Sequence, residues 1–226
     1  MAKSYKTPLF AWLACAGATA LLALIAYGSD AFQRQDANLL ARFIAHRDSE
    51  VGSLAAGCAH LGDPVPILLM LALACAIALQ RNRPLDAAAA IAVVAGANVT
   101  AQLLKVLLTH PRFQPVLGAN QLDATSFPSG HVAAVTSIAI AFAFVVPRGA
   151  RSLVAVLGVC LVAAVSSGVL VLAWHAPSDV LGGILVAAGW GFAVLAVLRF
   201  AETPAPQQPQ PPPAPQFPRR APIATK

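Results

Sequence analysis

Long apolar runs separated by short polar connections dominate this chain. Each run is 16 to 23 residues long, close to the roughly 20 residues that a helix needs to cross about 30 Å of hydrocarbon. The six runs are Pro8–Gly28, Val65–Gln80, Ala87–Leu108, His131–Pro147, Ser152–Trp174 and Val180–Phe200. The pattern predicts an all-α integral membrane protein with six transmembrane helices in a bundle. The first run follows Lys3 and Lys6 but is too long for a signal peptide, so we interpret it as an uncleaved helix.

One of the two long connections, Asp30–Asp63, has its own periodicity. Leu39, Leu40, Phe43 and Ile44 recur at helical spacing, with arginines between them. Such a segment favours a short amphipathic helix that lies at the membrane interface.

The composition changes abruptly after Phe200. Residues 201–226 hold nine of the 18 prolines and have almost no apolar periodicity, which is typical of a disordered, proline-rich tail. We therefore expect one membrane domain over residues 1–200 and a cytoplasmic tail over 201–226. The tail fits a plain spacer best, although a proline-binding partner is also compatible with it.

Composition and charge agree with a membrane protein. Of the 226 residues, 58% are apolar and 11% are charged, whereas soluble domains carry about 25% charged residues. The net charge of +6 is spread in short groups between the apolar runs, so it does not indicate a nucleic-acid partner. The four cysteines show no CxxC or Cys/His spacing, so neither a disulfide framework nor a metal site is predicted.

The distribution of lysine and arginine predicts the orientation. One side of the predicted membrane has ten of them and the other side has five, and the richer side faces the cytoplasm. The ten are Lys3, Lys6, Arg81, Arg83, Arg148, Arg151, Arg199, Arg219, Arg220 and Lys226, and the five are Arg34, Arg42, Arg47, Lys105 and Arg112. Both termini are therefore expected in the cytoplasm of a plasma (inner) membrane protein. The two long connections and the turn after Trp174 are expected outside.

The first of three polar clusters closes the third run. Lys105 and Arg112 occur in K-V-L-L-T-H-P-R, residues 105–112. A lysine costs about 2.5–3.5 kcal/mol at mid-membrane and less near the interface, so Lys105 alone is typical of a snorkelling anchor. Arg112 alone fits an ordinary loop charge. Together they supply two cations.

The second cluster, F-P-S-G-H at Phe127–His131, immediately precedes the fourth run. Ser129 is placed to cap a helix, and Gly130 lets a ligand approach the backbone closely. Free N–H groups and the positive end of a helix dipole favour an anion there. A simple cap beside an interfacial histidine explains the same residues equally well.

The third cluster, W-H-A-P-S-D at Trp174–Asp179, forms the turn between the last two runs. Asp179 is near enough to His175 to hold one ring nitrogen and leave the other as a nucleophile, unless the pair only closes the turn. All three clusters fall on the predicted outer face. Together they offer the cations, anion cradle, histidines and carboxylate that phosphoryl transfer requires.

In this order the motifs resemble those of the type-2 phosphatidic acid phosphatase family, membrane lipid phosphatases related to vanadium haloperoxidases. That family shows K-x6-R-P, P-S-G-H and S-R-x5-H-x3-D. Lys105 and Arg112 match the first motif, with Phe113 in place of its proline, and residues 128–131 match the second in full. The resemblance covers about residues 63–200.

The third motif matches only in part. His175 and Asp179 are present, but Gly168 and Val169 stand where the family has Ser and Arg. The family arginine forks around the phosphate. Its loss removes a charged hydrogen bond of about 1.5–3 kcal/mol, which predicts a 10- to 100-fold weaker hold on the transition state. His110, adjacent to the first cluster, is a candidate to compensate. Because the departure leaves His175 and Asp179 intact, we expect an active but specialised phosphatase.

The resemblance implies hydrolysis without a metal or other cofactor. His175 would attack phosphorus to form a phosphohistidine, with Asp179 fixing its tautomer. His131 would protonate the leaving oxygen and then help to activate water. The phosphoryl oxygens would be held by Lys105, Arg112, Ser129 and the Gly130 amide.

The implied substrate is a lipid phosphate or diphosphate whose headgroup reaches the outer face. In a bacterial cell envelope this would be a polyprenyl diphosphate, phosphatidate or phosphatidylglycerophosphate. Two other functions remain compatible with the sequence. One is a non-catalytic or weakened protein that binds a phosphorylated lipid, and the other is a phosphotransferase that uses the same site. The sequence does not indicate the oligomeric state.

Overall fold

The structure is a computed structural model that describes residues 4–202. These residues form helices and connecting turns, with no strand among them. The helices are α1 (Lys6–Gly28), α2 (Asp30–Ile44), α3 (Glu50–Ala59), α4 (Pro64–Gln80), α5 (Pro84–Leu107), α6 (Gly130–Val145), α7 (Arg151–Val171) and α8 (Pro177–Ala201), with 3₁₀ turns η1 (His60–Gly62), η2 (Pro115–Leu117) and η3 (Arg148–Ala150). The predicted proline-rich tail lies outside the described residues, apart from its first two positions.

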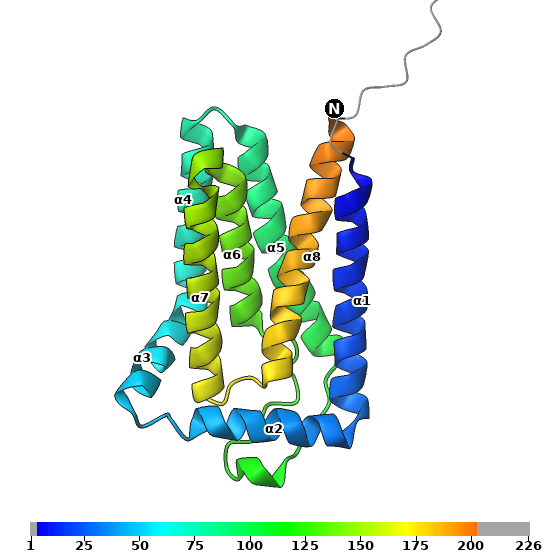
Figure 1. The fold of residues 1–226 in the computed structure, drawn as a ribbon, viewed down its shortest axis with the longest axis vertical. Coiled ribbons are helices and arrows are strands. Elements are labelled where there is room, and N and C mark those ends of the chain that lie inside the picture. Colours follow the sequence, from blue (N-terminus) through cyan, green and yellow to red (C-terminus); the bar gives the residue numbers. More distant parts are fainter. Residues whose placement is uncertain (1–3, 203–226) are drawn as a thin grey trace, which may run out of the picture.

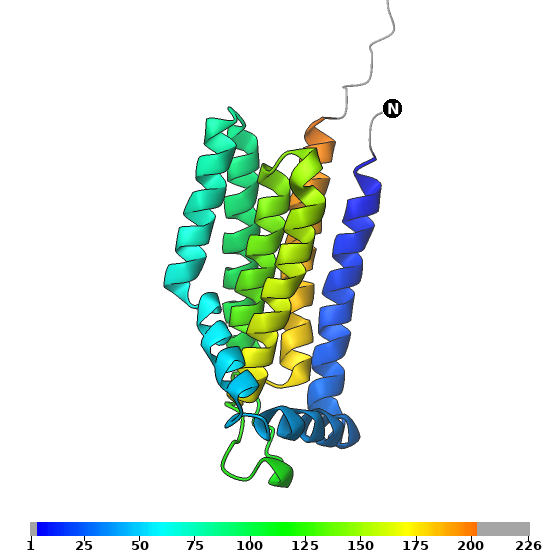
Figure 2. The same ribbon diagram turned by 60° about the vertical axis from the view of Figure 1, so that its left-hand side comes forward.

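Six helices run side by side along the long axis of the bundle: α1, α4, α5, α6, α7 and α8 (Figures 1 and 2). Each coincides, within a few residues, with one of the predicted apolar runs. Four candidate spans, in α1, α5, η3–α7 and α8, are long and apolar enough to cross a membrane. The segment Glu50–Gly62 and α4 meet at a bend of 61° and add a fifth if they are counted as one broken span. Since α6 has 16 residues and measures only about 24 Å, the six-span count stays a prediction.

Helix α2 lies across one end of the bundle (Figure 1). Ser29 caps it by accepting a hydrogen bond from the Phe32 amide at 3.3 Å. Ala37 and Leu40 are buried, while Arg34 and Arg42 are exposed. The amphipathic helix expected in this connection is therefore present, and its place at a membrane interface remains a prediction.

Helix α3, which the apolar pattern did not predict, packs directly against α7. A Cβ atom at Gly168 would lie 2.2 Å from the Ala55 carbonyl oxygen and 2.8 Å from the Ala59 nitrogen. Only a glycine allows the two backbones to approach so closely. This contact fixes η1, which follows α3, beside the end of α7.

Glycines also bring α8 against the start of α6. A Cβ atom at Gly183 would lie 2.6 Å from the Ser129 carbonyl oxygen, and one at Gly182 would lie 2.7 Å from the Phe127 ring. The N-termini of α6 and α8 therefore meet at the end of the bundle that α2 crosses. Both ends of the described chain lie at the opposite end (Figure 1).

Candidate active site

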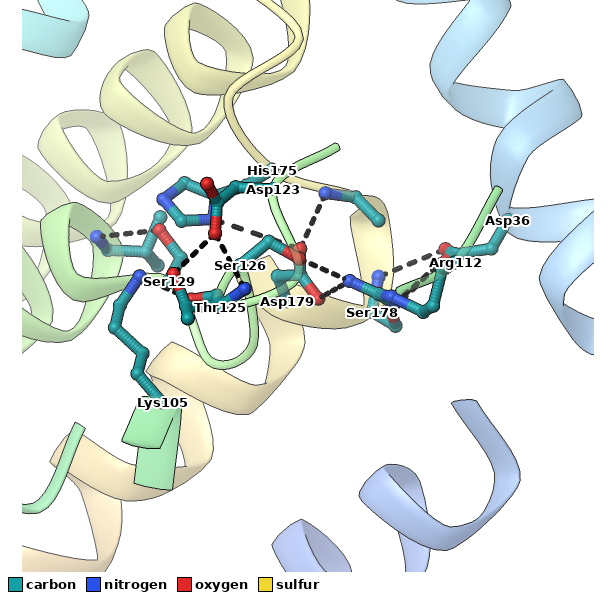
Figure 3. A network of polar contacts seen from close by, with 12 residues as sticks. Asp36, Lys105, Arg112, Asp123, Thr125, Ser126, Ser129, His175, Ser178 and Asp179 are labelled. Atoms are coloured by element: carbon teal, nitrogen blue, oxygen red, sulfur yellow. Dashed lines mark hydrogen bonds and ion pairs between the residues drawn. The ribbon is translucent and has the colours of Figure 1, made fainter. Parts of the chain in front are cut away.

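The three polar clusters of the sequence meet at the end of the bundle that α2 crosses. The end of α5 carries Lys105, the start of α6 carries His131, and the turn between α7 and α8 carries His175. The Ser129 amide donates to the Asp179 carbonyl oxygen at 2.9 Å, which joins the second cluster to the third. Figure 3 shows the resulting polar network.

His175 and Asp179 form a buried pair. The Nδ1 atom of His175 lies 3.7 Å from Oδ2 of Asp179, and both residues are almost inaccessible, at 5% and 0% exposure. The same Oδ2 accepts a hydrogen bond from the Ala176 amide at 2.8 Å, which fixes the carboxylate at the start of α8. His175 Nδ1 has no hydrogen-bond partner among the described residues, because 3.7 Å from Asp179 Oδ2 is beyond hydrogen-bond distance. Catalytic hydrogen bonds are commonly this long before substrate binds.

Arg112 binds the other oxygen of that carboxylate. Its Nη2 lies 2.6 Å from Asp179 Oδ1 and donates to Ser126 Oγ at 2.6 Å, while Nη1 donates to Ser178 Oγ at 3.2 Å. The guanidinium also lies 5.3 Å from the centre of the Tyr27 ring. Arg112 was predicted to hold phosphoryl oxygens, but here the protein itself occupies both of its terminal nitrogens.

Asp36 of α2 completes this network from a distant part of the sequence. Its Oδ1 accepts from the Ser178 amide at 3.0 Å, its Oδ2 accepts from the Ser178 hydroxyl at 2.6 Å, and Arg112 Nη1 lies 3.8 Å from Oδ2. Burial raises the pKa of the Asp36 carboxyl, an effect that the two Ser178 hydrogen bonds oppose. Asp36 thus caps α8 and ties α2 to Arg112.

A second carboxylate holds the other histidine. Oδ1 of Asp63 lies 3.1 Å from Nε2 of His131, and its Oδ2 lies 2.9 Å from Nδ1 of His60. Asp63 stands at the N-cap of α4, but its side chain makes no cap hydrogen bond and turns to the histidines instead. The hydrogen bond with His60, and then the one with His131, lowers the pKa of the Asp63 carboxyl. Gly62 makes room for this arrangement, because a Cβ atom there would lie 2.8 Å from the Cβ atom of His131.

The two histidine rings face a common space. Their centres are 6.2 Å apart, and the Trp174 ring packs at 5.2 Å from that of His131. Each histidine has a carboxylate beside one of its nitrogens, Asp179 for His175 and Asp63 for His131. Each therefore has a second nitrogen available for chemistry.

Lys105, Ser129 and Gly130 lie beside this space. Ser129 is the N-cap of α6, as predicted, and accepts from the Val132 amide at 3.4 Å. Lys105 donates to the Thr125 carbonyl oxygen at 3.1 Å. A Cβ atom on Gly130 would meet only Gln102 and Lys105, at 3.5 and 3.8 Å, so its backbone remains approachable. In the loop next to Lys105, hydrogen bonds from Thr125 lower the pKa of the Asp123 carboxyl.

An apolar groove of about 780 Å³ leads along the bundle toward the site. Residues of α1, α5 and α8 line it, including Trp12, Leu104 and Trp190. On α1 it extends from Trp12 to Gly28, a distance of about 24 Å at 1.5 Å per residue. Tyr27, which packs against Arg112, lies at the end nearest the site.

Comparison with known proteins identifies the family. The PAP2 superfamily matches residues 86–202, which is more than half of the chain. The chain belongs to the PAP2 superfamily. Its fold is similar to the crystal structure of the first transmembrane PAP2-type phosphatidylglycerolphosphate phosphatase from Bacillus subtilis, with a TM-score of 0.69 and 21% identity over 85% of this chain and 96% of that one. No curated protein matches the sequence.

The two departures from the third PAP2 motif, Gly168 and Val169, have structural counterparts. Gly168 lies against the backbone of α3, where a serine side chain would collide with Ala55. Val169 is fully buried in the hydrophobic core, and its carbonyl oxygen accepts from the Trp174 amide at 2.9 Å. His110, the suggested substitute cation, is exposed and lies edge-on to Tyr27 at 5.6 Å.

Sequence reasoning missed several residues of this PAP2 site. Asp36, Asp63 and His60 lie outside every motif, and they reach the site through the path of α2, α3 and η1. Tyr27 was assigned only to an apolar run. The available signal was the acidic content of the predicted outer connection, which holds five carboxylates, Asp36 and Asp63 among them. Carboxylates paired with histidine or arginine have shifted pKa values, and such shifts cluster at functional sites.

Proposed function

We propose that this PAP2 protein is a membrane phosphatase that hydrolyses a lipid phosphate or diphosphate through a phosphohistidine at His175. The observation that carries this proposal is the buried pair of His175 and Asp179 beside a second histidine, His131, that is itself bound to a carboxylate. The centres of the two histidine rings are 6.2 Å apart. The neighbouring Lys105 and the N-terminus of α6 provide positive potential for a phosphoryl group.

In the first step His175 acts as the nucleophile. Because Nδ1 faces Asp179, Nε2 is the atom that attacks phosphorus, and the phosphorus–oxygen bond to the lipid breaks. His131 gives its Nδ1 proton to the leaving oxygen, since Asp63 holds Nε2. Asp179 stabilises the positive charge that develops on His175, as a carboxylate does for a catalytic imidazole.

In the second step water replaces the histidine. Nδ1 of His131, now unprotonated, takes a proton from water as the water oxygen attacks phosphorus. The phosphorus–nitrogen bond breaks, inorganic phosphate leaves, and both histidines return to their starting states. Lys105, Ser129 and the Gly130 amide hold the phosphoryl oxygens in both steps.

Arg112 has a different part in this mechanism from the one that its motif suggests. Its charge stabilises the Asp179 carboxylate from the side opposite His175. A direct contact with phosphate would require Arg112 to exchange one of its present partners, Ser126 or Ser178. Since Val169 supplies no cation either, the phosphate hold depends mainly on Lys105 and the backbone.

The apolar groove supports a lipid as the substrate. It is long enough to hold much of an extended hydrocarbon chain while the headgroup reaches the site. Polyprenyl diphosphate, phosphatidate and phosphatidylglycerophosphate all fit this description. The positive-inside count supports a site on the extracytoplasmic face, with the termini in the cytoplasm.

The test is phosphate release by purified protein in detergent containing a chelator. Each of the three lipids is compared with a soluble phosphomonoester, and we expect release to be faster from at least one lipid. Appearance of the phosphoryl group on an added alcohol would instead identify a phosphotransferase. Lipid binding without release of phosphate would identify the non-catalytic alternative.

A further inference from the structure

A second large cavity lies at the end of the bundle opposite the candidate active site. Its volume is about 1130 Å³, and it opens between the α4–α5 turn, the α6–α7 connection and the last turns of α8. The two ends of the described chain lie at this same end of the bundle (Figure 1). The proposed phosphatase mechanism makes no use of this cavity.

The rim of the cavity is basic. Arg83, Arg148, Arg151 and Arg199 line it together with two acidic residues, Asp86 and Glu202, which leaves a formal excess of two positive charges. Arg83 pairs with Asp86 at 3.0 Å. Within residues 4–202, no carboxylate forms an ion pair with Arg148 or Arg151, and both are exposed. These two arginines are therefore available to an anion from outside.

The interior of the cavity is apolar. Ile140 and Phe144 of α6 line it together with Phe192 and Leu195 of α8. Its lining on α8 runs from Ala188 to Glu202, about 21 Å at 1.5 Å per residue. Basic groups at the mouth and hydrocarbon along the walls match an amphiphile with an anionic head.

We infer that this cavity binds an anionic phospholipid of the surrounding bilayer, in the leaflet opposite the active site. Its phosphodiester headgroup lies between Arg148 and Arg151, and its acyl chain lies against Phe144, Phe192 and Leu195. Basic pockets between transmembrane helices on the cytoplasmic side are suited to anionic headgroups. Arginine is also the side chain that best matches phosphate geometry.

The test measures lipid binding by native mass spectrometry in detergent. The probes are dioleoylphosphatidylglycerol and dioleoylphosphatidylcholine, which have the same chains and differ in net charge. Both are phosphodiesters, and the measurement is repeated in His175→Ala so that binding is read independently of phosphatase activity. We expect the anionic lipid to bind more tightly than the zwitterionic one in both backgrounds.

Two kinds of variant separate the headgroup from the cavity. Arg148→Gln with Arg151→Gln weakens phosphatidylglycerol binding about 30-fold, since each arginine near an anionic lipid contributes about fivefold. Ala188→Phe keeps every charge but projects a large side chain into the apolar part of the cavity, and it weakens phosphatidylglycerol binding. The matched control, Arg34→Gln with Arg42→Gln, removes two exposed arginines of α2 and leaves binding unchanged.

The inference fails on any of three results. One is equal binding of the two lipids by the unmodified protein. Another is undiminished phosphatidylglycerol binding by Ala188→Phe, which places the lipid elsewhere. The third is a loss of phosphatidylglycerol binding in the α2 control that equals the loss in the Arg148→Gln and Arg151→Gln variant. That result would mean that surface charge in general, and not this cavity, attracts the lipid. Because Ala188→Phe removes no arginine, it decides the question even if the double arginine variant does not fold.

Discussion

Arg112 Nη2 and Asp179 Oδ1 lie 2.6 Å apart inside the bundle, with side chains that are 4% and 0% exposed. The other oxygen of Asp179 faces His175, so one carboxylate joins the loop after α5 to the proposed nucleophile. Asp36 lies on the far side of the same guanidinium, at 3.8 Å. The position of the nucleophile therefore depends on a buried ionic network that reaches α2.

Removing Arg112 should destabilise the protein as well as inactivate it. Arg112→Ala leaves Asp36 and Asp179 buried without their cation, which costs about 3–5 kcal/mol. For a chain of this size we expect the thermal unfolding midpoint to fall by about 6–20 °C in detergent. Arg34→Ala removes an exposed arginine of α2 and should leave the midpoint almost unchanged. Equal midpoints for the two variants would contradict a structural role of Arg112.

Asp63 is expected to position His131. Asp63→Asn replaces the carboxylate with an amide, so the histidine loses its fixed orientation and its proton exchange slows. We expect kcat to fall about tenfold with little change in KM. This loss is smaller than the roughly 10²- to 10⁴-fold that removal of a general acid typically costs, because His131 itself is still present. Asp30→Asn, on the exposed start of α2, is the matched control. A change in KM alone would show that Asp63 acts in substrate binding.

The pH dependence of this variant follows from the direction of the Asp63 shift. The pKa of this carboxyl is lowered by the hydrogen bond with His60, so its contribution to stability is present above its unfolded pKa of about 3.9. That contribution is lost as the pH falls through the folded pKa. The difference in thermal midpoint between the unmodified protein and Asp63→Asn should therefore persist at pH 5 and shrink below about pH 4. A difference that already disappears at pH 6 would contradict the assignment.

Restoring the family serine at position 168 should harm this protein. In Gly168→Ser the new Cβ atom would lie 2.2 Å from the Ala55 carbonyl oxygen, so α3 must move away from α7. Overpacking of this kind costs about 1–3 kcal/mol. The control is Gly17→Ser in α1, where no heavy atom lies within 4 Å. If the midpoint of Gly168→Ser matches that of the control, α3 is not packed as described.

Filling the apolar groove should affect long-chain substrates selectively. Ala20 lines the groove, and Ala20→Phe displaces about two methylene groups of a bound chain. At about 0.8 kcal/mol for each methylene, we expect kcat/KM for a long-chain lipid phosphate to fall about tenfold. Activity on a short-chain analogue should not change. Ala14→Phe, outside the groove, is the control, and equal losses on both substrates would remove the groove from the account.

The sequence was sufficient to predict the helices that run along the bundle, because each of them consists of one continuous apolar run bounded by polar residues. It did not reveal α3, whose ten residues are mostly small and only weakly periodic, and which packs against Gly168 of α7. The motifs also located His131, His175 and Asp179 correctly at one end of the bundle. The motifs did not predict contacts that depend on tertiary structure. Asp36 contacts Ser178, which is 142 residues away in the sequence, and Asp63 contacts His131, which is 68 residues away.

The most direct test of the proposed mechanism is whether the phosphoryl group of the substrate becomes attached to His175. Lipid substrate labelled on its terminal phosphate is mixed with excess protein, quenched in alkaline denaturant within one turnover, and the labelled peptide is identified by mass spectrometry. The account predicts label on His175, none in His175→Ala, and a fall in phosphate release of at least about 1000-fold in that variant. Equal release of phosphate by the unmodified protein and His175→Ala would contradict it.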